Sequence, residues 1–145
     1  MKTFALSCFV VVASLAQAAA ADDPPFMRHL FPPELLMRNQ HEIGLSDEQR
    51  STITGAIRET QGSVLEIEWA MQDEARKLGE LLAAERVDAE AALAQVARVL
   101  DLEGQVKRAH MGLLIRIKNT LDPEQRSKLD ALRPDDFAAL LDQLF

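Results

Sequence analysis

LSDEQRSTI at residues 45–53 returns as LDPEQRSKL at residues 121–129 of this chain. Leu, Glu, Gln, Arg and Ser recur at the same offsets in the two copies, and an aliphatic residue closes both. Each copy opens with a leucine, Leu45 or Leu121, and the next residue is of a type that commonly begins helices. The repeat therefore predicts two helices that begin in the same way.

Helix capping gives a physical reason for the repeated pattern. The side-chain oxygen of Ser46 or Asp122 can accept a hydrogen bond from the first helical turn. Three residues later, the side chain of Gln49 or Gln125 can reach back to the N–H of the same cap. Pro123 fits the first helical position, where its missing N–H is not needed. For either copy taken alone, an ordinary helix cap with no relation to the other copy is the simpler interpretation.

The first 21 residues have the pattern of a secretory signal peptide. Lys2 supplies a positive charge, residues 4–15 are apolar, and the alanine-rich end offers cleavage sites near Ala18–Ala21. We therefore expect a periplasmic protein, with a retained inner-membrane anchor that faces the periplasm as the alternative. The single cysteine, Cys8, lies in this segment, so the mature protein has no disulfide and relies on packing for its stability.

The composition favours one small helical domain. Removal of the signal leaves about 124 residues, a length that suits a single domain. The full sequence is 48% hydrophobic but only 5% aromatic, and Ala, Leu, Glu, Gln and Arg dominate where alternating strand-forming residues are absent. The formal net charge of −7 becomes −8 once Lys2 is removed, which argues against a nucleic-acid partner because phosphates need a basic face.

Hydrophobic spacing and helix signals predict four helices, two of them long. They run from Pro33 to Ile43, from Ser46 to Ala84, from Asp88 to Asn119, and from Asp122 to a point before Pro134. Only residues 85–87 separate the two long helices, so these are expected to fold back as an antiparallel hairpin. The expected seam of the hairpin consists of Ile53, Ile57, Val64, Met71, Ala75, Leu78, Leu82, Ala92, Val96, Val99, Val106, Leu113 and Ile117.

The expected organisation is a signal peptide over 1–21, an extended arm over 22–33, a helical domain over 34–132 and a tail over 133–145. The tail carries a last amphipathic pattern, formed by Phe137, Leu140, Leu141 and Leu144. A hairpin with short flanking helices is too thin to cover both of its own apolar sides. We therefore expect a homodimer, in which a second copy supplies the cover.

The two Leu-[Ser/Asp]-x-x-Gln phrases, one on each side of a long hairpin and following a signal peptide, resemble the periplasmic Spy/CpxP family. That family is named for a Leu-Thr-x-x-Gln motif and includes zinc-resistance-associated proteins and heavy-metal-resistance sensors. Ser46 and Asp122 replace the usual Thr, and both residue types cap helices as well as Thr does. The resemblance covers residues 34–132. It implies an all-α, often cradle-shaped homodimer that either holds unfolded proteins without ATP or senses metal and signals to a membrane partner, such as a sensor kinase or an anti-sigma factor.

A metal-sensing role needs soft or borderline ligands that converge on one ion. In the metal-sensing relatives, histidines on the early helix and a histidine with a methionine on the later long helix are ligands, which points to His41, His110 and Met111. Glu59 is a further candidate, and zinc, copper, nickel or cobalt would suit such a set. His110 and Met111 lie about 100° apart around a helix, however. A half-buried seam position for His110 and a surface position for His41 are the alternative, and no cofactor is then required.

A role in holding unfolded proteins needs an adaptable apolar surface, because flexible side chains bind many sequences weakly. The candidates for a client or dimer surface are Leu65, Trp69, Met71, Met111 and Leu114. Trp69 follows Leu65 by four residues and is expected either to anchor a dimer or to contact clients. Catalysis is not expected, since a glycine-rich phosphate loop is missing and His41-Glu42 lacks the second histidine of a zinc-protease motif.

Overall fold

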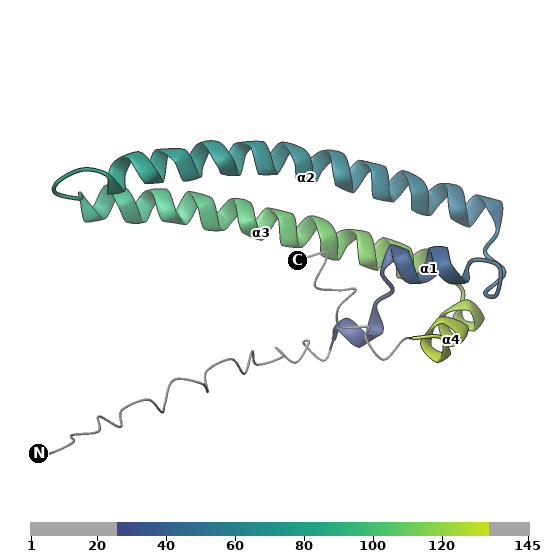
Figure 1. The fold of residues 1–145 in the computed structure, drawn as a ribbon. Helices are drawn as coiled ribbons and strands as arrows, with labels where there is room; N and C mark the ends of the chain where they lie inside the picture. Colours follow the sequence, from purple (N-terminus) through teal and green to yellow (C-terminus); the bar gives the residue numbers. More distant parts are fainter. Residues whose placement is uncertain (1–25, 134–145) are drawn as a thin grey trace, which may run out of the picture.

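The computed structural model describes residues 26–133, and all of its regular structure there is helical (Figure 1). After a short 3₁₀ helix, η1 (Met27–His29), come α1 (Pro33–Asn39), α2 (Asp47–Leu82), α3 (Ala89–Thr120) and α4 (Pro123–Ala131). The two long helices, α2 and α3, lie side by side as an antiparallel hairpin (Figure 1). The predicted all-α fold is confirmed. The predicted signal peptide, and the tail residues from position 134 onward, lie outside the described residues.

The inner face of α2 follows a spacing of three and four residues that continues along the whole helix. The residues at this spacing, all buried or half-buried, are Ile53, Ile57, Thr60, Val64, Ile67, Met71, Glu74, Leu78 and Leu81, and the buried Ala56 lies beside them. Alternating steps of three and four keep a seam facing a partner helix, as in a coiled coil. Ala75 and Leu82 were predicted in this seam but are exposed, because the inner positions one residue earlier, Glu74 and Leu81, occupy it.

The helix ends differ slightly from the predicted ones, and α1 differs most. It ends at Asn39 rather than at Ile43, and the side chain of Asn39 donates a hydrogen bond of 2.8 Å to the carbonyl oxygen of Leu35. The chain then turns through Gly44, whose φ of 66° is in the left-handed region that favours glycine. The turn brings Ile43, 2% exposed, into the core although it lies outside the helix.

The two repeated motifs meet at the end of the hairpin where α2 begins and α3 ends, which we call the base. Each motif forms a capping box, with Ser46 and Gln49 at the start of α2 and with Asp122 and Gln125 at the start of α4. The two glutamine side chains also pair with each other, because each Nε2 donates to the Oε1 of the other at 2.8 and 2.9 Å.

Each glutamine completes this pairing with a bond to the backbone of the residue just before the other motif. Gln49 Nε2 donates to the carbonyl oxygen of Thr120 at 2.9 Å, and Gln125 Nε2 donates to that of Gly44 at 3.3 Å. Both carbonyls belong to the residue two positions before a capping residue, so the arrangement is reciprocal. The repeated phrase therefore serves as a mutual clamp that joins α2, α3 and α4 at the base.

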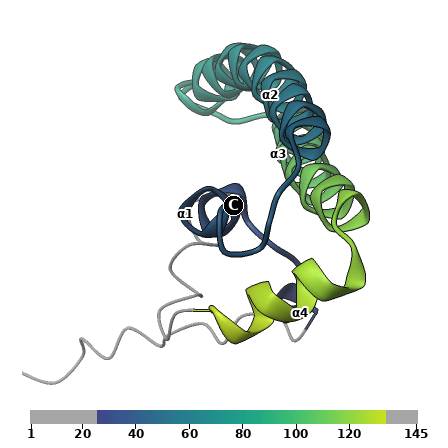
Figure 2. The ribbon, with the colours of Figure 1, turned by 90° about the vertical axis from the view of Figure 1, so that its right-hand side faces the viewer.

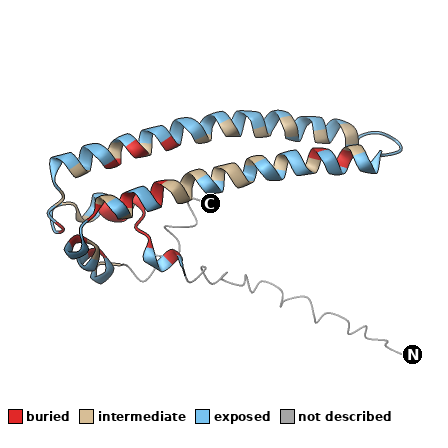
Figure 3. Ribbon diagram, turned by 180° about the vertical axis from the view of Figure 1, so that it is seen from behind, coloured by how far each residue is buried: buried red, intermediate tan, exposed pale blue. Residues whose placement is uncertain are grey.

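The core lies at the base, and the rest of the hairpin is two helices alone (Figure 3). Its larger cluster consists of Phe31, Leu35, Leu36, Ile43, Ile53, Ala56, Leu113, Ile117, Leu121 and Leu129. α1 and α4 lie on one side of the hairpin base and supply part of this cluster (Figure 2). Leu129, which closes the second motif, is fully buried, and Ile53, which closes the first, is 6% exposed.

A smaller cluster joins the N-terminal arm to α3. Met27, Leu30 and Leu114 form it, and Met111 packs against it. The arm was expected to be extended, but η1 lies within it because Met27 and Leu30 turn inward to cover Leu114. Leu114 was a candidate for a client or dimer surface and is instead completely buried, so it belongs to the core.

Candidate functional site

An apolar groove of about 590 Å³ lies beside the base of the hairpin, between α1, α2 and α3. Its walls come from residues far apart in the sequence, since α1 packs next to the hairpin. The lining consists of Pro33, Glu34, Met37, Ile57, Thr60, Gln61, Val64, Leu65, Glu68, His110 and Leu113. Two of the apolar side chains are well exposed, Met37 at 60% and Leu65 at 54%. The groove therefore has the apolar, solvent-open character of a binding surface.

Helix geometry explains why α2 contributes most of the wall. Ile57, Gln61, Leu65 and Glu68 follow one another at steps of three and four, so their side chains share a face beside the seam. Trp69 follows Leu65 by one turn and is 64% exposed, so it extends the same face toward the far end of the hairpin.

The charged carboxylates of the groove lie among neutral polar groups and the imidazole of His110. Glu34 and Glu68 carry carboxylates, and Thr60 and Gln61 supply neutral hydrogen-bonding groups. The Oε2 atom of Glu34 is buried, and no hydrogen-bond donor within residues 26–133 reaches it. Burial of such an acceptor is unfavourable. The groove therefore combines an apolar floor with acidic positions that favour donors or cations.

The candidate surface residues from the sequence have different places in the fold. Leu65 lines the groove, and Trp69 continues its face. Met71 is half-buried in the hairpin seam, and Met111 is half-buried against the smaller cluster. Sequence reasoning missed Met37 and Glu68 as groove residues, because nothing in the spacing along one helix shows that α1 lines the same groove as α2 and α3.

The structure does not bring the candidate metal ligands together as one site. Within residues 26–133, no three His, Cys, Asp or Glu side chains form a group that could hold a metal ion. His41 is exposed in the turn after α1, whereas His110 lies in the groove. Glu59 instead pairs with Arg116 across the hairpin, with 2.7 Å between its Oε2 atom and an arginine nitrogen.

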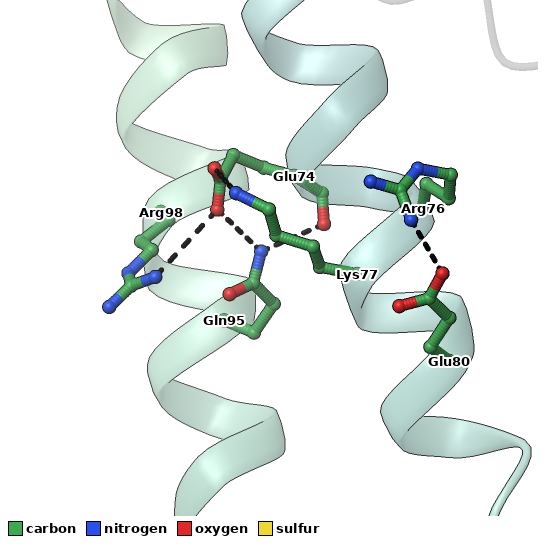
Figure 4. A network of polar contacts seen from close by, with 6 residues as sticks. All are labelled: Glu74, Arg76, Lys77, Glu80, Gln95 and Arg98. Carbon is green, nitrogen blue, oxygen red and sulfur yellow. Dashed lines mark hydrogen bonds and ion pairs between the residues drawn. The ribbon is translucent and has the colours of Figure 1, made fainter.

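A polar layer crosses the hairpin between its middle and its tip (Figure 4). Gln95, which is 5% exposed, donates through Nε2 to the backbone oxygen of Glu74 at 2.8 Å and to its carboxylate at 2.6 Å. Lys77 donates to the same carboxylate at 2.6 Å, and Arg98 lies 3.9 Å from it. The hydrogen bonds from Lys77 and then Gln95 hold the pKa of Glu74 below its usual value. This layer was not predicted, because the sequence pattern favoured Ala75 for the seam.

No helix within residues 26–133 is long and apolar enough to cross a membrane. In comparisons with known proteins, residues 3–128 match a family described as heavy-metal resistance. No curated protein and no solved structure matched the chain. The match covers most of the chain, including the first repeated motif, the hairpin and all of the second motif except its last residue, Leu129.

Proposed function

Because this chain belongs to the heavy-metal resistance family, which is the Spy/CpxP-like family of periplasmic LTxxQ proteins, we propose that it is an envelope-stress protein that binds unfolded polypeptides without ATP. The observation that carries the proposal is the groove and the apolar side chains that continue it. Met37 and Leu65 in the groove, and Trp69 farther along α2, each expose more than half of their surface. Unfolded chains present apolar residues that such a surface can cover.

The expected affinity follows from the apolar surface that remains to be buried. Complete burial of one large apolar side chain is worth about 1.5–3 kcal/mol. Each of the three side chains is already partly covered by its neighbours, so together they offer on the order of 3–6 kcal/mol before the cost of association. This range corresponds to weak binding of many sequences, which suits a protein that holds clients briefly. A methionine side chain adapts its shape to different clients.

A homodimer would raise this weak affinity, because two grooves on one particle can bind one extended chain. Trp69 is exposed in the single chain and remains a candidate both for the dimer contact and for the client surface. The proposed location is the periplasm after cleavage of the signal peptide near Ala18–Ala21. There, a membrane sensor kinase or an anti-sigma factor is the proposed signalling partner, because the occupied and empty grooves would present different surfaces to it.

An aggregation assay with an unfolded client tests the main proposal. The chain from Asp22 onward should suppress light scattering by the client without nucleotide. Leu65→Asp should weaken the suppression because it places a charge in the groove, whereas Leu93→Asp should not. Leu93 is a matched control, since it is 68% exposed on α3 and does not line the groove. Equal suppression by both variants, or none by the unmodified chain, contradicts the proposal.

Metal binding is the second proposed function, and the family description favours it. His110 lies in the groove and Met111 follows it, so these residues could supply ligands with groups from another chain. Calorimetry with zinc, copper, nickel and cobalt tests this function. Tight stoichiometric binding that His110→Ala abolishes, without any effect on client aggregation, would favour a metal sensor over a protein that holds clients.

A further inference from the structure

We propose that the groove selects polypeptide segments in which a lysine or an arginine lies beside apolar residues, because Glu34 and Glu68 place carboxylates next to its apolar side chains. This inference rests on the proposed function and names the kind of client segment that the groove prefers. A groove with apolar walls alone binds any apolar segment, whereas fixed carboxylates on those walls add a preference for positive charge.

One oxygen of the Glu34 carboxylate has no hydrogen-bond donor. Its Oε2 atom is buried, and no donor within residues 26–133 reaches it, although His110 lines the same groove. The start of α1 does not supply a donor, because Pro33 has no N–H and the N–H of Leu35 donates to the carbonyl oxygen of Pro32 at 3.1 Å. A carboxylate that is partly removed from water and lacks donors is stabilised by a nearby cation.

The Glu34 carboxylate remains open to a ligand in the groove. Glu34 as a whole residue is half-buried and lines the groove, so a cation that enters the groove can approach it. The negative charge of a carboxylate is shared by its two oxygens, so a cation beside the group also stabilises the covered Oε2 atom. Within the described part of the chain, neither Glu34 nor Glu68 has an ion-pair partner.

Each carboxylate lies one helical turn from an exposed apolar side chain of the groove. Glu34 precedes Met37 by three residues on α1. Glu68 follows Leu65 by three residues on α2, and residues at this spacing share a helix face. A segment that covers Met37 and Leu65 therefore brings its neighbouring residues to the carboxylates. There a basic side chain is attracted and its apolar stem adds to the contact, whereas an acidic side chain is repelled.

Binding of labelled peptides, followed by fluorescence anisotropy, tests this preference. Three peptides share the same leucine and alanine residues and differ only at the central position, which is Lys, Gln or Glu. The chain from Asp22 onward should bind the Lys peptide about three- to tenfold more tightly than the Gln peptide, as expected for a partly exposed, charge-assisted contact. The Glu peptide should bind most weakly. The differences should shrink as the salt concentration rises, because salt screens partly exposed charges.

Variants of the chain place the preference in the groove. Glu34→Gln should remove most of it, whereas the Gln peptide should still bind because the apolar side chains are kept. Glu68→Gln should remove a smaller part, since Glu68 is exposed on α2, and it tests the groove without any change in α1. Glu66→Gln is the matched control, because it alters the net charge equally at an exposed α2 position outside the lining. This control should keep the preference.

Equal affinity for the three peptides would overturn the inference and leave the proposed function standing. The same holds for an equal loss of preference in Glu34→Gln and Glu66→Gln, because the overall charge of the acidic chain would then be its cause. A preference that survives both Glu34→Gln and Glu68→Gln would place the acidic site elsewhere. Absence of binding by all three peptides would also overturn the inference, and the aggregation assay then shows whether the proposed function fails with it.

Discussion

Replacement of Gln125 by Ala tests the meaning of the repeated motif most directly. The Gln125 side chain takes part in four hydrogen bonds, one with the cap N–H of Asp122, two with Gln49 and one with the carbonyl oxygen of Gly44. It is 5% exposed, so water cannot easily replace these bonds. The substitution should therefore destabilise the whole base of the hairpin and not only the first turn of α4.

The magnitude follows from the bonds that are lost. Asp122 remains as the N-cap, so the substitution removes only the Gln125 half of the capping box, and each buried hydrogen bond that is lost costs about 0.5–1.5 kcal/mol. The losses overlap, since Gln49 keeps its bonds to Ser46 and Thr120. We expect Gln125→Ala to lower the free energy of unfolding by about 3 kcal/mol. Gln49→Ala should cost about 2 kcal/mol because its site is more exposed and water can take over some bonds.

The double variant gives the sharper result. Because the two glutamines share two hydrogen bonds, Gln49→Ala with Gln125→Ala should cost about 1 kcal/mol less than the sum of the single variants. Urea unfolding followed by circular dichroism measures all three values. Gln105→Ala is the control, since its amide bonds to Asp101 in the same helix. Strict additivity, or a loss no larger than that of the control, would refute the mutual clamp.

Three further predictions use other parts of the molecule. Because hydrogen bonds hold the pKa of Glu74 below its usual value of 4.5, the stability that this carboxylate contributes is present above pH 4.5 and is lost as the pH falls through the lowered pKa. Thermal melts should therefore separate wild type from Glu74→Gln at neutral pH and converge once the pH has fallen below the lowered pKa of Glu74. Leu114→Ala should cost about 2–5 kcal/mol in urea unfolding through a cavity under Met27 and Leu30, and a loss below about 1 kcal/mol would contradict its core position. Light scattering at tens of micromolar should give the mass of a homodimer, and a monomeric mass would contradict the proposed dimer.

The hairpin could be predicted from sequence because its signals are local. Apolar spacing, the short link over residues 85–87 and the two caps each depend on residues close together in the chain. The seam position of Glu74 could not be predicted in this way. Its carboxylate belongs between the helices only because Gln95, on the other helix, supplies donors to it. Such a pair is recognisable only when the register of the two helices is known.

The groove could not be predicted because three separate elements build it. The exposed face of α2 was recognised through Leu65 and Trp69, but its partner Met37 comes from α1, whose position depends on the core at the base. Leu114 was misplaced for the same reason. Its spacing on α3 suits a flank of the helix, and only the inward turn of Met27 and Leu30 shows that the flank is covered.

The uneven distribution of the core links the fold to the proposed function. Outside the base, the buried positions of the hairpin include Ala92 and Gln95, a small side chain and a polar one. Small and polar inner side chains bury little apolar area, so this end of the hairpin should open at a lower free energy than the base. The clamp of Gln49 and Gln125 restrains the opposite end, next to the groove. A protein built in this way can keep its groove in place while the distant half of the hairpin adjusts to a bound chain.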